Sequence, residues 1–199
     1  MDRNIIRTIF LALGAIFALL LLIAGIGGWL ITGPTPPYPG TPVVASDEAA
    51  LSLDDKIAEF EQEIDEAVCE ELLTLTITEE EATSKLDQLA REGELSVEMN
   101  CIQIHFADST IYGSAQVRPV IHMQVAIQAT IKAEDGKPDI TIESLHLGRL
   151  HIPRTLIDNV MTALEREIED RWEALPIEFE QISIEDGEMI IIGRVKQSS

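Results

Sequence analysis

The side chains that most often support catalysis or metal binding are sparse in this chain. Its four histidines, His105, His122, His146 and His151, all fall in or beside segments with the pattern of β-strands. Imidazole is the usual general base and metal ligand near neutral pH. However, His122 shares the polar side of its expected strand with Gln124, where a histidine is ordinarily solvated. We therefore assign no catalytic or metal-binding role to these histidines.

No local motif adds a catalytic function. The chain contains no Gly-x-Ser-x-Gly, no His-Glu-x-x-His, no phosphate-binding loop and no dinucleotide fingerprint, which mark common hydrolase, metalloprotease and nucleotide sites. Carboxylates are too abundant for any pair to identify a site, and none has the spacing of a calcium loop. We predict that the protein is not an enzyme and has no cofactor and no metal.

Cys69 and Cys101 are the two cysteines of the chain. A disulfide between them would close a loop of about 33 residues and stabilise the fold by roughly 3 to 4 kcal/mol. Two buried free thiols are the alternative, because a sequence does not show whether two Cα atoms come within bridging distance.

Residues 8–32 form an uncharged apolar run preceded by Arg3 and Arg7. Roughly 20 apolar helical residues cross the hydrocarbon of a bilayer, so residues 1–32 are expected to form a single transmembrane anchor. The two arginines place the N-terminus in the cytoplasm and the rest of the chain outside the cell membrane. A cleaved signal peptide is the alternative, although its apolar core is ordinarily only about 7 to 15 residues long.

Residues 33–50 are proline-rich. Proline blocks helix continuation and favours extended backbone, so we expect a stalk that holds the following domain up to about 40 Å from the bilayer. Residues 51–199 suffice for one extracytoplasmic domain. The net charge of the chain, −21 from 35 acidic and 14 basic residues, argues against binding of nucleic acid or anionic lipid headgroups through a basic patch.

Two amphipathic helices are expected at the start of the domain. Apolar residues recur at three- and four-residue steps over residues 51–72, as in a helix with one buried face. A second helix is expected at residues 78–92, where Thr78 and Glu81 form a capping box. A short apolar piece, residues 73–77, separates the two helices.

Residues 95–149 have the alternation of long strands. The pattern is most regular over residues 121–133, where one face is apolar and the other polar, and Asp135-Gly136 supplies a hairpin turn. The apolar phase changes near Cys101, which indicates a β-bulge.

The end of the chain predicts a core helix and a hairpin. Residues 153–175 carry one apolar stripe, and residues 177–195 form a closing hairpin. The fold class is therefore α+β: a single N-terminal transmembrane helix, then an antiparallel β-sheet of long curved strands packed on or wrapped around amphipathic helices. The broad apolar sheet face leaves two arrangements open: the helices cover it completely, or the sheet curls and leaves an apolar groove for a lipid.

The order of these elements resembles a known group of proteins. The matching segments are LTITEEEATSKL, which ends at Leu86, GKPDITIESLHLGRLHIPRTLID at residues 136–158, and ISIEDGEMIIIG at residues 182–193. They are similar to the YpmS-like anchored extracytoplasmic bacterial proteins, and more distantly to LmeA-like phospholipid-binding proteins, which are likened to tubular lipid-binding domains. The resemblance implies a curved sheet that binds a lipid or another apolar ligand, and it carries no catalytic signature.

The expected function is therefore non-catalytic binding of a lipid or other apolar small molecule by a membrane-anchored domain. The residues expected to line the apolar interior, whose other role is plain core, are Met123, Val125, Ile127, Ile142, Leu145, Leu147, Met161 and Leu164. The alternative is a cell-envelope scaffold that meets a protein partner through the polar sheet face, residues 124–128, or through an acidic helix.

Overall fold

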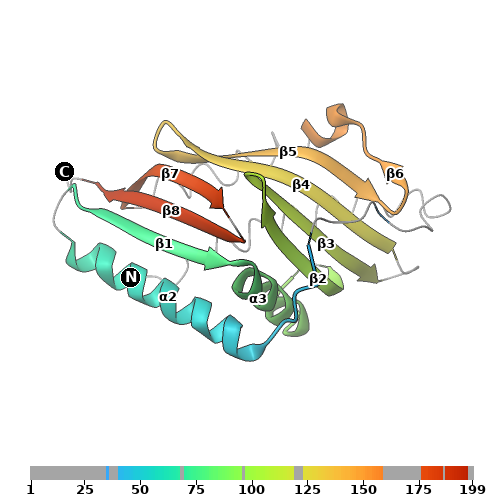
Figure 1. Cartoon of the computed structure of the whole chain (residues 1–199), viewed down its shortest axis with the longest axis horizontal. Coiled ribbons are helices and arrows are strands. Elements are labelled where there is room, and N and C mark those ends of the chain that lie inside the picture. The colour runs from blue at the N-terminus through green and yellow to red at the C-terminus, as the bar shows by residue number, and fades with distance from the viewer. Residues whose placement is uncertain are drawn as a thin grey trace.

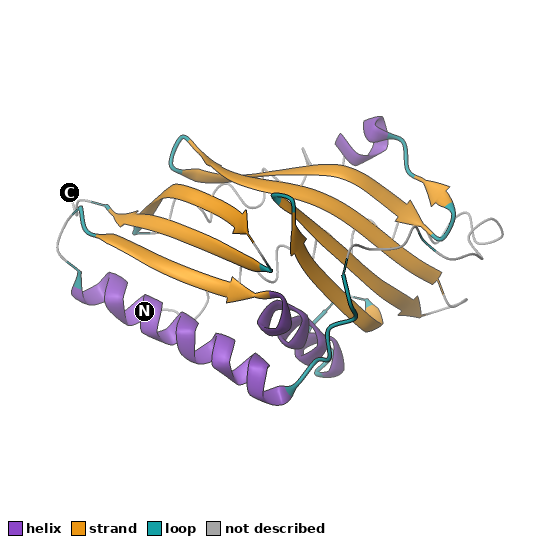
Figure 2. Cartoon of the chain, viewed as in Figure 1, coloured by secondary structure: helices purple, strands orange, loops and turns teal. Residues whose placement is uncertain are grey.

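The computed structural model describes residue 35 and residues 40–67, 70–95, 97–118, 123–158, 176–185 and 187–196. These residues form an α+β fold with antiparallel sheets (Figure 1), in which the two long helices lie along one side (Figure 2). Within those ranges, no helix is long and apolar enough to cross a membrane. The predicted anchor, residues 1–32, lies outside them.

The described strands form two sheets, whereas the sequence predicts one. The smaller sheet has the order β1-β8-β7 and consists of β1 (Leu72–Thr78), β7 (Ile177–Glu185) and β8 (Glu188–Val195). The larger sheet has the order β2-β3-β4-β5-β6 and consists of β2 (Glu98–Ala107), β3 (Thr110–Arg118), β4 (Met123–Glu134), β5 (Lys137–Leu147) and β6 (Leu150–His151). The single-sheet prediction is wrong because the closing hairpin pairs with β1 through β8.

The first helix, α2 (Asp47–Glu66), begins and ends earlier than the predicted range 51–72. The Ser46 hydroxyl accepts a hydrogen bond from the Ala49 N–H at 3.1 Å and so caps the helix start. Ala67 is already extended, and the chain then enters β1. The apolar piece that separates the two predicted helices is thus an edge strand, because its backbone pairs with β8.

The second helix, α3 (Glu79–Arg91), confirms the predicted capping box. The Thr78 hydroxyl accepts from the Glu81 N–H at 3.2 Å, and the Glu81 carboxylate accepts from the Thr78 N–H at 3.0 Å. Gly93 follows the helix with a φ of +72°, a conformation that glycine adopts without strain.

The predicted irregularities of the large sheet are also confirmed. The β2–β3 register shifts between Asn100 and Gln103, and Cys101 lies in the shift with a φ of +51°. Asp135 and Gly136 both have positive φ in the β4–β5 turn. Of the predicted helix 153–175, residues 154–158 form a helical turn that begins one residue later than predicted, and residues 159–175 lie outside the described residues.

One hydrophobic core connects both sheets with both long helices. Its members include Leu53 and Phe60 of α2, Leu86 of α3, Ile104 of β2 and Phe179 of β7. In Figure 1, α2 runs along β1, while α3 lies between the small sheet and β2. Backbone bonds also join the sheets, since Phe179 donates to the Gly136 carbonyl at 2.9 Å and Gly187 to the Phe106 carbonyl at 3.2 Å.

Part of the predicted stalk lies against the domain. The Val43 N–H donates to Gln103 Oε1 at 2.7 Å, and Gln103 Nε2 donates to the Val43 carbonyl at 2.9 Å. The Thr35 N–H donates to Gln124 Oε1 at 3.2 Å. We call Thr35 together with residues 40–46 the strap. A stalk that extends over the whole of residues 33–50 is therefore wrong, because the strap binds β2 and β4, and residues 47–50 belong to α2.

Candidate apolar binding site

The candidate site is built on one apolar face of the large sheet. Antiparallel register places small and large apolar residues of β3, β4 and β5 side by side. The rows are Ile111–Ala129–Ile142, Gly113–Ile127–Leu145 and Ala115–Val125–Leu147. A register shift in β5, between the partners of Gln128 and Ala129, keeps Ile142 and Leu145 on this face despite their odd spacing.

A cavity of about 60 Å³ opens between this face and α3. Its apolar walls include Leu86 of α3, Ile104 of β2, Ile111 of β3, Ile127 and Ile131 of β4, and Ile142 of β5. Gly113 and Ala129 also line it. Because these two residues have little or no side chain, they leave room where larger residues would fill the space between sheet and helix.

The structure divides the predicted lining residues into two groups. Ile127 and Ile142 line the cavity. Val125, Leu145 and Leu147 lie on the same face, are at most 2% exposed and do not line this cavity. They lie in the predicted apolar interior, where plain core is the other role expected from the sequence.

The remaining three predictions have other outcomes. Met123 lies half-buried at the start of β4 and is not part of the cavity wall. Met161 and Leu164 lie outside the described residues. The sequence did not predict that Leu86 and the isoleucines of β2 line the cavity. The change of apolar phase at Cys101 indicated only that Ile102 and Ile104 lie on the same face.

His105 has a structural role near this site. Its side chain is buried, and its Nδ1 lies 3.3 Å from Glu79 Oε2. Glu79 Oε1 accepts from the Phe106 N–H at 2.6 Å, which ties the start of α3 to β2. A Cβ on Gly40 would lie 3.1 Å from His105 Nδ1, so the strap packs directly over the imidazole.

The other described histidines form a pair at the β5–β6 hairpin. His151 Nδ1 and His146 Nε2 are 3.3 Å apart, and the ring centroids are separated by 4.9 Å. Burial and, second, the nearby charge of His151 lower the pKa of His146 below its ordinary value. No group of three or more potential metal ligands occurs among the residues that the structure describes. His122 lies outside them.

The structure describes one of the two cysteines. Cys101 is exposed at the bulge of β2. Cys69 lies outside the described residues, so the predicted disulfide remains a prediction. Because Cys101 is exposed, the alternative of two buried free thiols is wrong.

Fold and site together define an α+β domain with an apolar cavity beneath a five-stranded antiparallel sheet. Comparison of the chain with models of protein families, with curated proteins and with solved structures finds no match. Its function must therefore be argued from the geometry and chemistry of its own residues.

Proposed function

We propose that the protein is anchored in the cell membrane and that its extracytoplasmic domain binds a lipid or another apolar ligand without catalysis. The observation that supports this proposal best is the apolar cavity between α3 and the large sheet. Hydrocarbon enters such a site without losing hydrogen bonds, whereas a buried polar ligand would lose them. The apolar run at residues 8–32 and the resemblance to YpmS-like proteins favour the same function.

The size of the cavity restricts the ligand. Its volume, about 60 Å³, is well below the roughly 300 to 1,000 Å³ of sites that enclose a drug-sized molecule. A bulky ring system does not fit without displacement of the walls. The ligand that fits best is the end of one hydrocarbon chain, such as a fatty acyl chain of a membrane lipid.

Photo-crosslinking tests this proposal on the full chain. Cells that express the protein are fed a fatty acid with a photoactivatable group, irradiated, and the crosslinked peptides are mapped by mass spectrometry. We expect crosslinks to peptides of β2–β5 as well as to the apolar run. Crosslinks to residues 8–32 show that the probe reached the surrounding lipid. If these crosslinks form and none form to β2–β5, the result contradicts ligand binding.

A pair of variants on one strand makes the test specific. Ile127→Trp fills the cavity and should abolish crosslinks to β2–β5, because a large side chain occupies the ligand space. Gln128→Trp is the matched control: Gln128 is exposed on the opposite face of β4, so its crosslinks should equal those of the unmodified chain. Equal crosslinking of both variants would show that the cavity is not the binding site.

The location of the domain has its own test. Cys101 is exposed, so a membrane-impermeant maleimide should label it in spheroplasts after brief treatment with an impermeant reductant. Labelling that required permeabilised cells would place the domain in the cytoplasm and contradict the proposed orientation.

The scaffold alternative is supported by the exposed acidic surface of α2 but less by the polar sheet face. Gln124 and Gln103 of the larger sheet bind the strap, which occupies part of the surface that a partner would use. Affinity capture of the full-length chain and of a variant with α2 carboxylates replaced by amides would detect a partner that depends on this helix.

A further inference from the structure

The acidic residues of this chain are unevenly distributed. Between Asp108 and Glu134, and again between Glu143 and Asp158, the sequence contains no acidic residue. The segment of α2, DEAALSLDDKIAEFEQEIDE, is by contrast rich in them. A net charge of −21 therefore describes the molecule as a whole but not every part of its surface.

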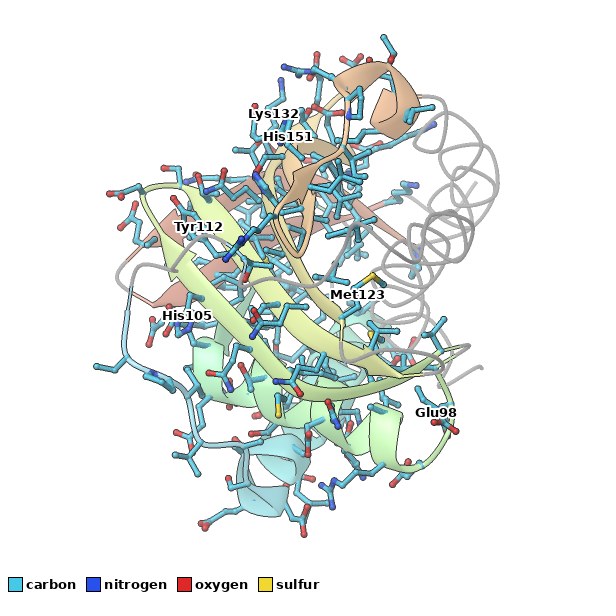
Figure 3. The ribbon with its side chains drawn as sticks, turned by 90° about the vertical axis from the view of Figure 1, so that its right-hand side faces the viewer. Glu98, His105, Tyr112, Met123, Lys132 and His151 are labelled. Atoms are coloured by element: carbon cyan, nitrogen blue, oxygen red, sulfur yellow. The ribbon has the colours of Figure 1, made fainter. Side chains whose placement is uncertain are left out.

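The two acid-free segments meet at one end of the large sheet. Val125 pairs with Leu147, and the Gly148 N–H donates to the Gln124 carbonyl at 2.7 Å. We call residues 123–124 and 148–157 the acid-free end. Figure 3 looks onto this side of the molecule, with Met123 and His151 labelled.

Basic and apolar side chains project from the acid-free end. Arg149 and Arg154 are exposed, and no ion pair joins either of them to another described residue. Leu150 and Leu156 are 43% and 46% exposed, and they lie beside the two arginines in the same segment. Exposed arginines beside exposed leucines are typical of a surface that enters the headgroup region of a membrane.

The segment that carries these residues is held in place. The Ile152 N–H donates to the Leu145 carbonyl at 2.9 Å, and the side chains of Ile152 and Ile157 are buried. Because these two isoleucines point into the domain, Leu150 and Leu156 are kept on its surface.

The strap places the acid-free end close to the apolar run. Thr35 donates to the side chain of Gln124 at 3.2 Å, and the apolar run ends at Thr32. The three residues from Thr32 to Thr35 span at most about 10 Å even when fully extended. If residues 8–32 cross a bilayer, the acid-free end lies next to its surface.

We infer that the acid-free end is a membrane-docking surface for anionic phospholipid. Arg149 and Arg154 bind headgroup phosphates, and Leu150 and Leu156 enter the interface between headgroups and acyl chains. The acidic remainder of the domain is repelled by the same lipids, so the charge distribution favours one orientation. This inference rests on the proposed membrane anchor. The net negative charge of the whole chain therefore opposes this docking less than the sequence predicts, because only charges within about 10 Å of the headgroups act strongly on them.

The test uses the full-length chain in lipid nanodiscs. A nitroxide is attached at Leu150→Cys, in a chain that also carries Cys69→Ser and Cys101→Ser. Its collision rates with oxygen and with a water-soluble nickel chelate are compared in nanodiscs with and without phosphatidylglycerol. The matched control is Leu72→Cys, because Leu72 is 56% exposed and is the first residue of β1, a strand that begins on the side of the molecule away from β6 (Figure 1).

We expect the label at position 150 to be shielded from nickel and exposed to oxygen in phosphatidylglycerol nanodiscs, while the label at position 72 stays in water. Arg149→Gln combined with Arg154→Gln should lower the equilibrium constant for docking about fivefold for each arginine removed. Arg91→Gln with Arg194→Gln should not change it, since those arginines pair with Asp47 and Glu180 away from this end. Equal nickel accessibility at positions 150 and 72 would overturn the inference.

A separate readout distinguishes this inference from the proposed function. Crosslinking of a photoactivatable phospholipid to β2–β5 in the same nanodiscs reports the cavity. Docking without crosslinks to β2–β5 would overturn ligand binding and support the docking surface. Crosslinks to β2–β5 without docking would support ligand binding and overturn the docking surface. A chain that does not remain in the nanodisc would overturn the anchor and the docking surface together.

Discussion

Only part of the role of Glu81 can be predicted from its neighbours in the sequence. Its spacing from Thr78 predicts the capping box, and the structure confirms it. The same carboxylate also accepts hydrogen bonds from Lys56 at 2.9 Å and Ser52 at 2.8 Å, both from α2. These contacts link the two long helices. No pattern in the sequence predicts them, because they depend on how α2 packs across α3.

Replacement of Glu81 by glutamine should destabilise the fold by about 2 kcal/mol, because Lys56 would lose its charged partner at a buried position. Glu80→Gln is the matched control, since Glu80 is exposed in the same helical turn and its loss should change stability by less than about 0.5 kcal/mol. Urea unfolding of both variants measures the difference. Equal stabilities would mean that the bond between the helices contributes nothing.

The same carboxylate makes stability depend on pH. Burial alone would raise the pKa of Glu81, but hydrogen bonds from Lys56, Thr78 and Ser52 and the charge of Lys56 outweigh it, so the pKa lies below its ordinary value of 4.5. The unfolded chain therefore binds this proton more readily than the folded one. The stabilisation is present above pH 4.5 and is lost as the pH falls through the lowered pKa. The difference in unfolding free energy between the unmodified chain and Glu81→Gln should shrink over that range.

His146 should titrate below 6.5, its ordinary pKa, because it is partly buried and lies beside His151. Since the folded state holds this proton less tightly, stability should fall as the pH is lowered from 6.5 through the folded pKa. Proton NMR of the imidazole resonances measures the midpoint. His151→Ala removes the neighbouring charge and should shift the midpoint of His146 upward. An unchanged midpoint would leave burial as the sole cause.

At the scale of elements, local signals were predictable and long-range pairing was not. The phase change at Cys101 and the Asp135-Gly136 turn follow from alternation and turn chemistry, and both are confirmed. Residues 72–78 form a strand only because β8, more than a hundred positions later, pairs with them. The end of α2 was misplaced for the same reason, since the apolar spacing that predicts a helix continues into β1.

The strap is a further element that the sequence does not predict. The prolines of residues 33–46 favour extended backbone, but the docking of the strap depends on the side chain of Gln103. Gln103→Leu should therefore release the strap, because it removes both hydrogen bonds to Val43.

Hydrogen exchange measures this release at the Val43 amide. Loss of one hydrogen bond of about 1.4 kcal/mol corresponds to roughly tenfold faster exchange. Gln128→Leu is the control, because Gln128 lies on β4 and accepts from Ser144 rather than from the strap. If Val43 exchanged equally fast in the unmodified chain and in Gln103→Leu, the strap would not depend on these bonds.

At the scale of the whole molecule, the candidate site was predicted in part. The apolar face of β4 and β5 was identified correctly, and Ile127 and Ile142 line the cavity. The sequence does not predict which part of this face borders the cavity. That depends on how the side chains of α3 and β2 pack over the small residues Gly113 and Ala129. Packing of this kind involves residues that are distant in the sequence.

The shared core predicts that the two sheets unfold together. Phe179 of β7 and Ile104 of β2 belong to one hydrophobic cluster with both helices, so neither sheet can lose its packing alone. Phe179→Leu should destabilise the fold by roughly 1 to 2 kcal/mol, and it should speed up exchange of the slowest amides in β3 and β4 as much as in β1 and β8. Ile104→Val, in the other sheet, should show the same common effect with a smaller loss, about 1 kcal/mol. Faster exchange confined to the sheet that carries the substitution would mean that each sheet is an independent folding unit, and the cavity would then depend on α3 and the large sheet alone.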